Sequence, residues 1–464
     1  MKKKLIITLA LLSLVLVPIL AQAVEFKLGG YVKMETIWDS TDVDKNLLLF
    51  PQVLRNNDPL GQHGRLKFSA ANTRMNFMIK GPELWGAKTT GFIEWDFEDG
   101  TVARAGVPVH NERLRIRHAM FRLNWPETEL MMGKYWSMLT EEIPETANFG
   151  ACTTAGAPFL RTPQIRLTQK FLGDWTAAIA LAEPVNGRWG GDEPAANRNT
   201  GESSETPQVN AKVVYSKDLW GKGAYWGKPR PFSARVAMSW QRNRYSGDWA
   251  TAGRTWGQDQ YVAVAARQRD QQYLDKWLVE GSLFIPIIPT YTENLAGTLS
   301  LLTQWFVGAG MDTWLEDGAN ESTYLVWQRF NAVTGFNEYD RELQRRWGGF
   351  AQLTYYFTNQ WFLNAVYGIN RAYGISNERD INAPGGYKFA TVNAVADPVK
   401  MNQHYYLCLY YRPIQALKFG LEYTFVRTDY FQISGPNPNA APVGQPRSDY
   451  GDNHRLLFAG WFFF

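Results

Sequence analysis

The sequence predicts an all-β fold, a transmembrane antiparallel β-barrel of about sixteen strands with long extracellular loops and short periplasmic turns. Three observations support this prediction. Aromatic residues make up 14% of the chain, yet the mean hydropathy is negative, as expected when outward apolar side chains alternate with inward polar ones. Strand-like segments recur along the chain. The chain also ends on an amphipathic, aromatic strand.

Residues 1–23 have the pattern of a cleavable secretory signal. Three lysines at 2–4 precede an apolar run over 5–20 and a small-residue cleavage site at 21–23, so we expect the mature chain to start at Val24. Loss of these lysines lowers the formal charge from +4 to about +1, a balance that gives no support to a nucleic-acid partner.

Beyond this signal, no apolar run approaches the roughly 18 residues that a membrane-spanning helix requires, which argues against a helical membrane protein. The chain has two cysteines, Cys152 and Cys408, too few for a disulfide scaffold. They form either a single bridge or two free thiols.

Segments with strand-like alternation are separated by turns and loops in a regular order. They span, to within a few residues, 26–38, 65–80, 87–98, 112–125, 128–136, 163–172, 175–183, 207–216, 230–244, 273–285, 295–308, 345–357, 360–371, 401–412, 415–427 and 453–464. The count must be even if both termini lie in the periplasm. Residues 260–267 are therefore assigned to a loop arm or to the upper part of the following strand.

Short and long connections alternate between these strands. The short ones carry turn formers such as Gly81-Pro82 and Thr358-Asn359, with 217–229 as a longer exception, and should face the periplasm. Long polar segments such as 137–162 and 309–344 should face outward. A single barrel accounts for residues 24–464.

The final strand alternates apolar and polar side chains and ends on Phe464. Such an ending resembles the signal by which the barrel-assembly machinery recognises proteins destined for the bilayer of the Gram-negative outer membrane. By itself the same pattern also fits an ordinary strand of a β-sandwich.

A barrel of about sixteen strands is wide enough for an aqueous channel, so the inward side chains matter. Arg113, Arg115 and Arg117 alternate on one face of the fourth predicted strand, and Arg166 and Lys170 share a face of the sixth. Because a ring of Arg or Lys side chains around a pore favours the passage of anions, these residues are candidates for the pore lining.

The second predicted strand is ambiguous. Arg65 and Lys67 fall on one parity and Arg74, a further pore candidate, falls on the other. Either a bulge intervenes or these groups do not all face inward.

Acidic residues accompany the basic ones. Glu94 and Asp96 share a face of the strand between two Arg-bearing strands. They either line the pore or neutralise neighbouring arginines across the wall, because an unpaired charge in a narrow lumen is costly.

The segment 137–162 carries three carboxylates, Glu141, Glu142 and Glu145. In general porins the third loop commonly folds into the barrel and forms the constriction. If this one does, its carboxylates face the arginines of the fourth and sixth strands and create a transverse field. The alternative is an acidic loop solvated at the surface.

Several segments resemble trimeric outer-membrane porins of the DcaP-like kind. They include GYVKMETIWD at 30–39, RLRIRHAMFRL at 113–123 and MGKYWS at 132–137. The resemblance implies a sixteen-stranded barrel, a homotrimer and passive uptake of small organic anions such as carboxylates. It also implies that Arg74, Arg115 and Arg117 line the pore.

The sequence thus favours a passive diffusion channel for small polar solutes with a leaning to organic anions. One alternative is an adhesin or structural barrel with a closed lumen; another is a barrel-embedded hydrolase. The five histidines are scattered and no Gly-x-Ser-x-Gly motif occurs, so we expect no enzyme. No cofactor or metal is expected either, because the EF-hand-like start at Asp42 and Asp44 lacks the glycine and glutamate that such a loop requires.

Overall fold

The computed structural model describes most of the predicted barrel and parts of its loops. The described residues are 24–41, 53, 55–56, 63–99, 113–149, 154–184, 201–246, 271–311, 314–315, 323–331, 336–373, 387–389, 399–430 and 448–464. The segment 260–267 and the candidate signal lie outside them.

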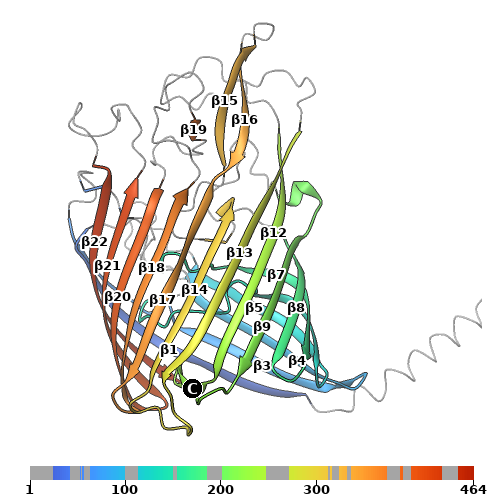
Figure 1. Cartoon of the computed structure of the whole chain (residues 1–464). Coiled ribbons are helices and arrows are strands. Elements are labelled where there is room, and N and C mark those ends of the chain that lie inside the picture. The colour runs from blue at the N-terminus through green and yellow to red at the C-terminus, as the bar shows by residue number, and fades with distance from the viewer. Residues whose placement is uncertain are drawn as a thin grey trace, which may run out of the picture.

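Within these ranges, seventeen strands form one closed antiparallel sheet, in which the first strand pairs with the last (Figure 1). The wall strands are β1 (Glu25–Asp39), β2 (Arg65–Ser69), β3 (Arg74–Leu84), β4 (Ala87–Asp99), β5 (Arg113–Asn124), β6 (Thr128–Trp136), β7 (Arg161–Phe171), β8 (Trp175–Ala182), β9 (Gln208–Lys217), β12 (Phe232–Ser246), β13 (Gln271–Ile288), β14 (Leu299–Ala309), β17 (Arg345–Tyr356), β18 (Trp361–Tyr373), β20 (Val399–Ile414), β21 (Leu417–Tyr430) and β22 (Tyr450–Phe463). Because β2 and β3 both pair with β1 as one interrupted strand, the described wall has sixteen strands. The predicted fold is confirmed.

The interruption between β2 and β3 is a bulge. Glu35 of β1 lies opposite Ser69, and Tyr31 lies opposite Arg74, so the β2–β3 side has one residue more than β1 between these pairs. An extra residue reverses the parity of the side chains that follow it. Arg65 and Arg74 therefore both point inward, as the first of the two predicted alternatives requires.

Inward and outward faces alternate along the wall as a membrane barrel demands. On β1, Val32, Met34 and Trp38 are exposed on the outer face, whereas Lys33 and Glu35 are buried inside. The seam between β1 and β22 is closed by a buried ion pair, in which Arg455 donates to both oxygens of Asp39 at 2.7 and 3.0 Å.

Smaller elements lie outside the wall sheet. A 3-10 turn, η2 (Glu202–Ser204), precedes β9, and β10 (Gly223–Tyr225) pairs with β11 (Lys228–Arg230) between β9 and β12. The predicted loop 309–344 contains two paired strands, β15 (Thr323–Asn331) and β16 (Phe336–Leu343), and β15 also pairs with β19 (Tyr387–Phe389). This sheet stands beyond the wall at the end that carries the long loops (Figure 1). No helix in the described ranges is long and apolar enough to cross a membrane.

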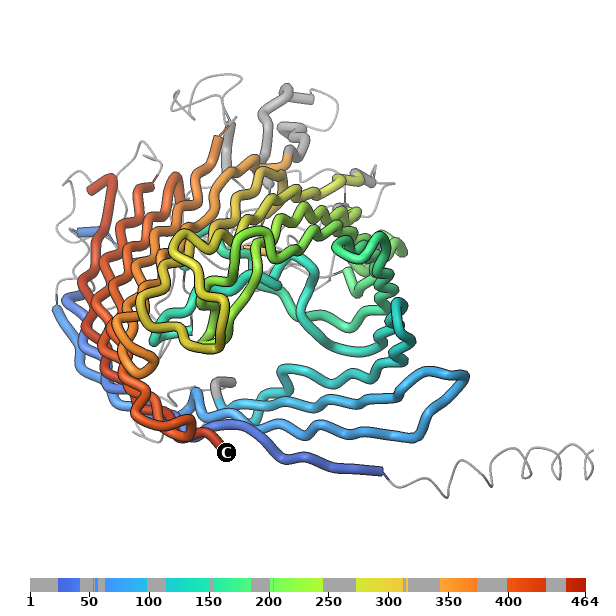
Figure 2. The backbone as a smooth tube through the Cα atoms, turned by 60° about the horizontal axis from the view of Figure 1, so that its bottom comes forward, coloured from blue at the N-terminus to red at the C-terminus, as the bar shows by residue number. Residues whose placement is uncertain are grey.

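The two ends of the barrel differ in their connections. The C-terminus lies at the end where the short turns join the strands, which comes forward in Figure 2; we call it the short-turn end. At this end the backbone N–H of Phe464 donates to the carbonyl of Gly30 at 3.2 Å.

Candidate functional site

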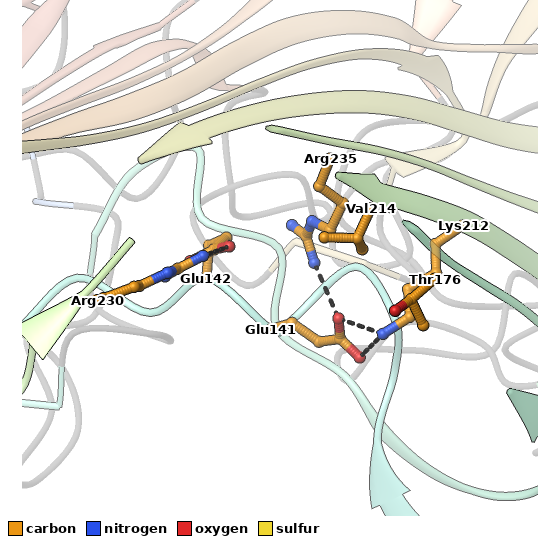
Figure 3. Close-up of a pocket in the computed structure, with 7 residues that line it drawn as sticks. All are labelled: Glu141, Glu142, Thr176, Lys212, Val214, Arg230 and Arg235. Carbon is orange, nitrogen blue, oxygen red and sulfur yellow. Dashed lines mark hydrogen bonds and ion pairs between the residues drawn. The ribbon is translucent and has the colours of Figure 1, made fainter. Parts of the chain in front are cut away.

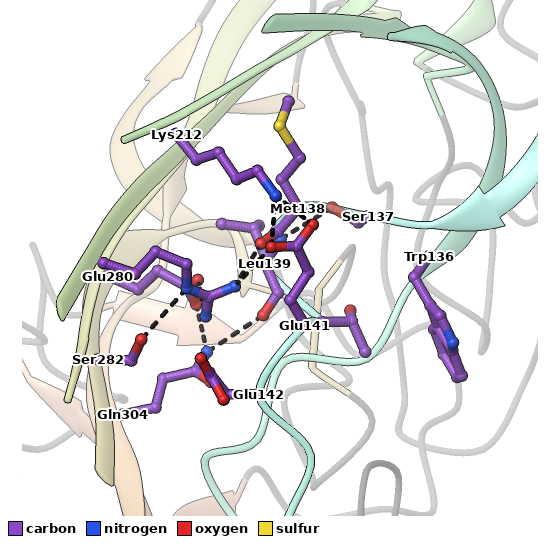
Figure 4. Close-up of polar contacts among 12 residues, drawn as sticks. Trp136, Ser137, Met138, Leu139, Glu141, Glu142, Lys212, Glu280, Ser282 and Gln304 are labelled. Carbon is purple, nitrogen blue, oxygen red and sulfur yellow. Dashed lines mark hydrogen bonds and ion pairs between the residues drawn. The ribbon is translucent and has the colours of Figure 1, made fainter. Parts of the chain in front are cut away.

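The segment between β6 and β7 crosses the interior of the barrel. We call its described parts, 137–149 and 154–160, the crossing loop. At its start, the carbonyl of Met138 accepts a hydrogen bond from Arg235 of β12 at 2.7 Å, and that of Leu139 accepts one from Gln304 of β14 at 3.1 Å (Figure 4). Both wall residues are buried inside the barrel, so the loop leaves β6 inward.

The first acidic residue of the loop joins three cations of the wall. The Glu141 carboxylate lies 2.5 Å from Lys212 of β9, 3.2 Å from Arg166 of β7 and 3.6 Å from Arg235. Burial by itself raises the pKa of Glu141, but the attraction of Lys212, Arg235 and Arg166 outweighs it, so the pKa lies below its ordinary value. Glu141 is therefore an anion held between neighbouring strands.

A pocket of 360 Å³ opens beside this ion pair (Figure 3). It is lined by Glu141, Glu142, Thr176, Lys212, Val214, Arg230 and Arg235. The pocket is thus formed by three strands of the wall, the crossing loop and β11. Its charged lining consists of three cations and two carboxylates.

The second acidic residue of the loop, Glu142, forms an ion pair with β11. Arg230 of β11 binds both oxygens of Glu142, at 2.7 and 2.8 Å, in the bidentate geometry of a strong guanidinium–carboxylate pair. Burial raises the pKa of Glu142, but the hydrogen bonds and charge of Arg230 outweigh it and lower the pKa overall.

The loop then reaches the opposite wall. Glu145 lies 3.1 Å from Lys418 of β21, and the amide of Ala147 donates to Glu422 at 2.5 Å. Lys33 of β1 donates to the carbonyl of Ala147 at 2.8 Å. Contacts on β9, β12, β21 and β1 together show that the chain spans the lumen.

On its return the loop lies directly on the wall backbone. The amide of Ala155 donates to His404 of β20 at 3.1 Å. A Cβ at Gly368 would lie 2.2 Å from the carbonyl oxygen of Ala155, closer than any real contact allows. Gly156 has φ +75° and would meet the wall at the same distance with a Cβ. Glycine at both places therefore permits the close approach.

A second charged group lies on β3, β4 and β5. Arg115 binds both oxygens of Asp96 at 2.8 Å, and Arg117 binds Glu94 at 2.7 Å and Asp96 at 2.8 Å. Arg74 lies 3.7 Å from Glu94. Because Asp96 and Arg117 are almost fully buried, this is a buried ionic network on the inner face of the wall.

Comparisons with known proteins agree on the architecture. No protein-family model and no curated protein matches the sequence. The outer membrane channel DcaP of Acinetobacter baumannii has a TM-score of 0.62 and 16% identity, over 95% of this chain and 98% of that chain. An anion-selective porin from Comamonas acidovorans has a TM-score of 0.51 and 10% identity, over 95% of this chain and 100% of that one. The fold is that of an outer-membrane porin. The DcaP-like fold that the sequence resemblance implied is thus confirmed.

The porin fold brings the predicted residues into two groups. Arg74, Glu94, Asp96, Arg115 and Arg117 lie together on β3 to β5, and Arg166 joins Glu141 on the other side of β6. The three loop carboxylates form direct ion pairs, and one of these pairs is with the predicted Arg166.

Two predicted residues lie elsewhere. Lys170 is exposed near the short-turn end of β7. The backbone of Arg113 belongs to β5, opposite Asp99, and its side chain lies outside the described structure.

The barrel interior also contains cations besides the candidates named above. Lys212, Arg230, Arg235 and Lys418 all pair with the loop. Arg161, the first residue of β7, lies over the rings of Trp136 and Phe159 at 4.9 and 5.1 Å. Its buried Nη1 has no hydrogen-bond partner among the described residues.

The described residues contain no cluster of His, Cys, Asp and Glu suited to a metal ion. Cys408 is a buried free thiol, and Cys152 lies outside the described residues.

Proposed function

We propose that this chain is a porin of the Gram-negative outer membrane, a passive diffusion channel for small polar solutes that prefers organic anions such as carboxylates. The crossing loop supports this proposal above all, because a loop fastened to both walls narrows a sixteen-stranded lumen, and a pocket of 360 Å³ lies beside it. In this proposal the pocket beside Glu141 is the narrowest part of the solute path.

The anion preference follows from the charges that face this path. The pocket is lined by three cations and two carboxylates. Arginine and lysine at a constriction attract anions and supply hydrogen-bond donors to carboxylate oxygens. The net positive lining therefore favours anions over cations.

Reconstitution in planar bilayers tests both parts of the proposal. We expect stepwise single-channel currents and, in a salt gradient, a reversal potential of anionic sign that declines in Lys212→Gln. Folded, heat-modifiable protein that never conducts would overturn the channel and favour an adhesin or structural barrel with a closed lumen. Conductance with cationic selectivity would keep the channel and overturn the anion preference.

The remaining parts of the proposal concern assembly. The signal 1–23 is removed on export, Phe464 is recognised by the barrel-assembly machinery, and three copies associate, as the sequence resemblance implies. N-terminal sequencing of protein from outer-membrane fractions should start at Val24, and native mass spectrometry should give a trimer. A monomeric mass would refute the oligomeric part alone.

A further inference from the structure

The connection between β9 and β12 enters the barrel from the short-turn end. The backbones of Lys222 and Thr290 exchange two hydrogen bonds of 2.8 Å, and Ser300 of β14 donates to the carbonyl of Ala224 at 2.7 Å. Ala224 is buried, and a Cβ at Gly223 would lie 2.9 Å from that of Ser300. The β10–β11 hairpin is therefore packed against the inner wall.

The tip of this hairpin contacts the crossing loop at Ile143. The amide of Ile143 donates to the Tyr225 hydroxyl at 3.3 Å, and the indole of Trp226 donates to the Ile143 carbonyl at 3.2 Å. The two hydrogen bonds from Arg230 to Glu142 lie directly beside them. The Tyr225 hydroxyl also lies 3.5 Å from the Ile143 carbonyl, to which it donates. Loop and hairpin thus meet inside the lumen through five hydrogen bonds.

The hairpin ends in a tight two-residue turn at this contact. Trp226 and Gly227 have φ of 49° and 76°, as such a turn requires. Trp85 and Gly86, between β3 and β4, have a similar pair of positive φ values, so the turn itself does not depend on the loop. Its link to the loop is the indole hydrogen bond of Trp226.

Arg230 is fixed on the hairpin side before it meets the loop. Its guanidinium lies over the rings of Tyr225 and Phe284 at 4.7 and 4.8 Å, and it donates to Ser233 at 2.7 Å. A guanidinium held in this way presents its fork to Glu142 with little loss of side-chain entropy. Figure 3 shows Arg230 and Glu142 on one side of the pocket, with Glu141, Lys212 and Arg235 on the other.

We propose that the β10–β11 hairpin is a second constriction element, which enters from the periplasm and sets the position of the crossing loop. Arg230 is the positioning residue: it holds Glu142, and through the adjacent residue it keeps Glu141 opposite Lys212 and Arg235. The narrowest part of the pore is then built by chain segments from both sides of the membrane. This inference rests on the proposed channel function for its effect on conduction, but the contact itself can be tested separately.

A charge exchange tests the contact. The variants are Arg230→Glu, Glu142→Arg and the two together, with Trp226→Phe as a milder change that removes only the indole hydrogen bond. The matched control is Lys217→Glu, which breaks the pair with Asp174 at 2.8 Å at the start of the same connection, where the two side chains are 49% and 33% exposed. Heat-modifiable electrophoretic mobility selects folded protein.

Hydrogen exchange in residues 139–149 and single-channel recording are then compared. We expect Arg230→Glu to speed exchange of these amides by roughly tenfold or more and to raise conductance and open-channel noise, with partial recovery in the double variant. Trp226→Phe should give a smaller effect, and Lys217→Glu none.

The proposal is overturned if folded Arg230→Glu and Trp226→Phe both exchange like the wild type, or if Lys217→Glu has the same effect as Arg230→Glu. A wild-type protein that does not conduct would refute the channel function, and the exchange data would still decide whether the hairpin holds the loop.

Discussion

Replacing Arg117 with methionine should destabilise the barrel more than any exposed arginine on the same strand. The change removes two charge-assisted hydrogen bonds, of 2.7 and 2.8 Å, to Glu94 and Asp96. At about 1.5–3 kcal/mol each, they amount to about 3–6 kcal/mol before relaxation. Arg115 keeps Asp96 paired, so we expect a net loss of about 3 kcal/mol, the lower end of the range for removing one partner of a buried pair.

Urea unfolding of the reconstituted barrel, followed by tryptophan fluorescence, measures this loss. Arg122→Met on the same strand is the control: Arg122 lies 3.6 Å from Glu129, and both side chains are about one quarter exposed. Its loss should be about 1 kcal/mol or less. If the two variants lose the same free energy, the β3–β5 network is not the buried ionic cluster inferred from its geometry.

Three further predictions follow from the same contacts. Asp96→Asn removes a carboxylate shared by two arginines and should move the reversal potential in the anionic direction; a cationic shift would contradict the charge assignment. Because the pKa of Glu141 is lowered in the folded protein, its stabilisation is present above the ordinary value of 4.5 and is lost only as pH falls through the lower, folded pKa. Hydrogen exchange of the loop amides, corrected for the intrinsic rate, should therefore not change between about pH 7 and about pH 5. Faster exchange within that range would refute the pairing of Glu141. Glu422→Gln weakens the acceptor of the Ala147 amide and should raise exchange at that amide several-fold, whereas an unchanged rate would show that the amide is protected by other contacts.

Local alternation was sufficient to predict the wall. The period of two identifies strands, and the parity change between Arg65 and Arg74 indicates the bulge that the structure contains. The paired strands β15 and β16 were not predicted, because their segment is bounded by polar residues and was assigned to a loop as a whole. Arg161 was missed because the predicted strand began two residues too late.

The wall residues that pair with the crossing loop could not be predicted from this alternation. Glu141 and Lys212 are 71 residues apart, Glu142 and Arg230 are 88 apart, and Glu145 and Lys418 are 273 apart. Periodicity reports which side of a strand a residue occupies but not which distant strand faces it across a closed barrel. The acidic loop and the basic strands were thus visible separately, and their pairing depends on closure of the sheet.

The contacts that hold the crossing loop against the wall also constrain the order of folding. Its hydrogen bonds to Glu422 and His404 join residues 275 and 249 positions apart, and Lys33 reaches it from β1, which pairs with the last strand. Contacts of such long sequence separation form late, since chain entropy opposes them until other pairings shorten the intervening path. All of these contacts can be present together only after the C-terminal strands have joined β1. We therefore expect the crossing loop to be fixed in place in one of the last steps of folding.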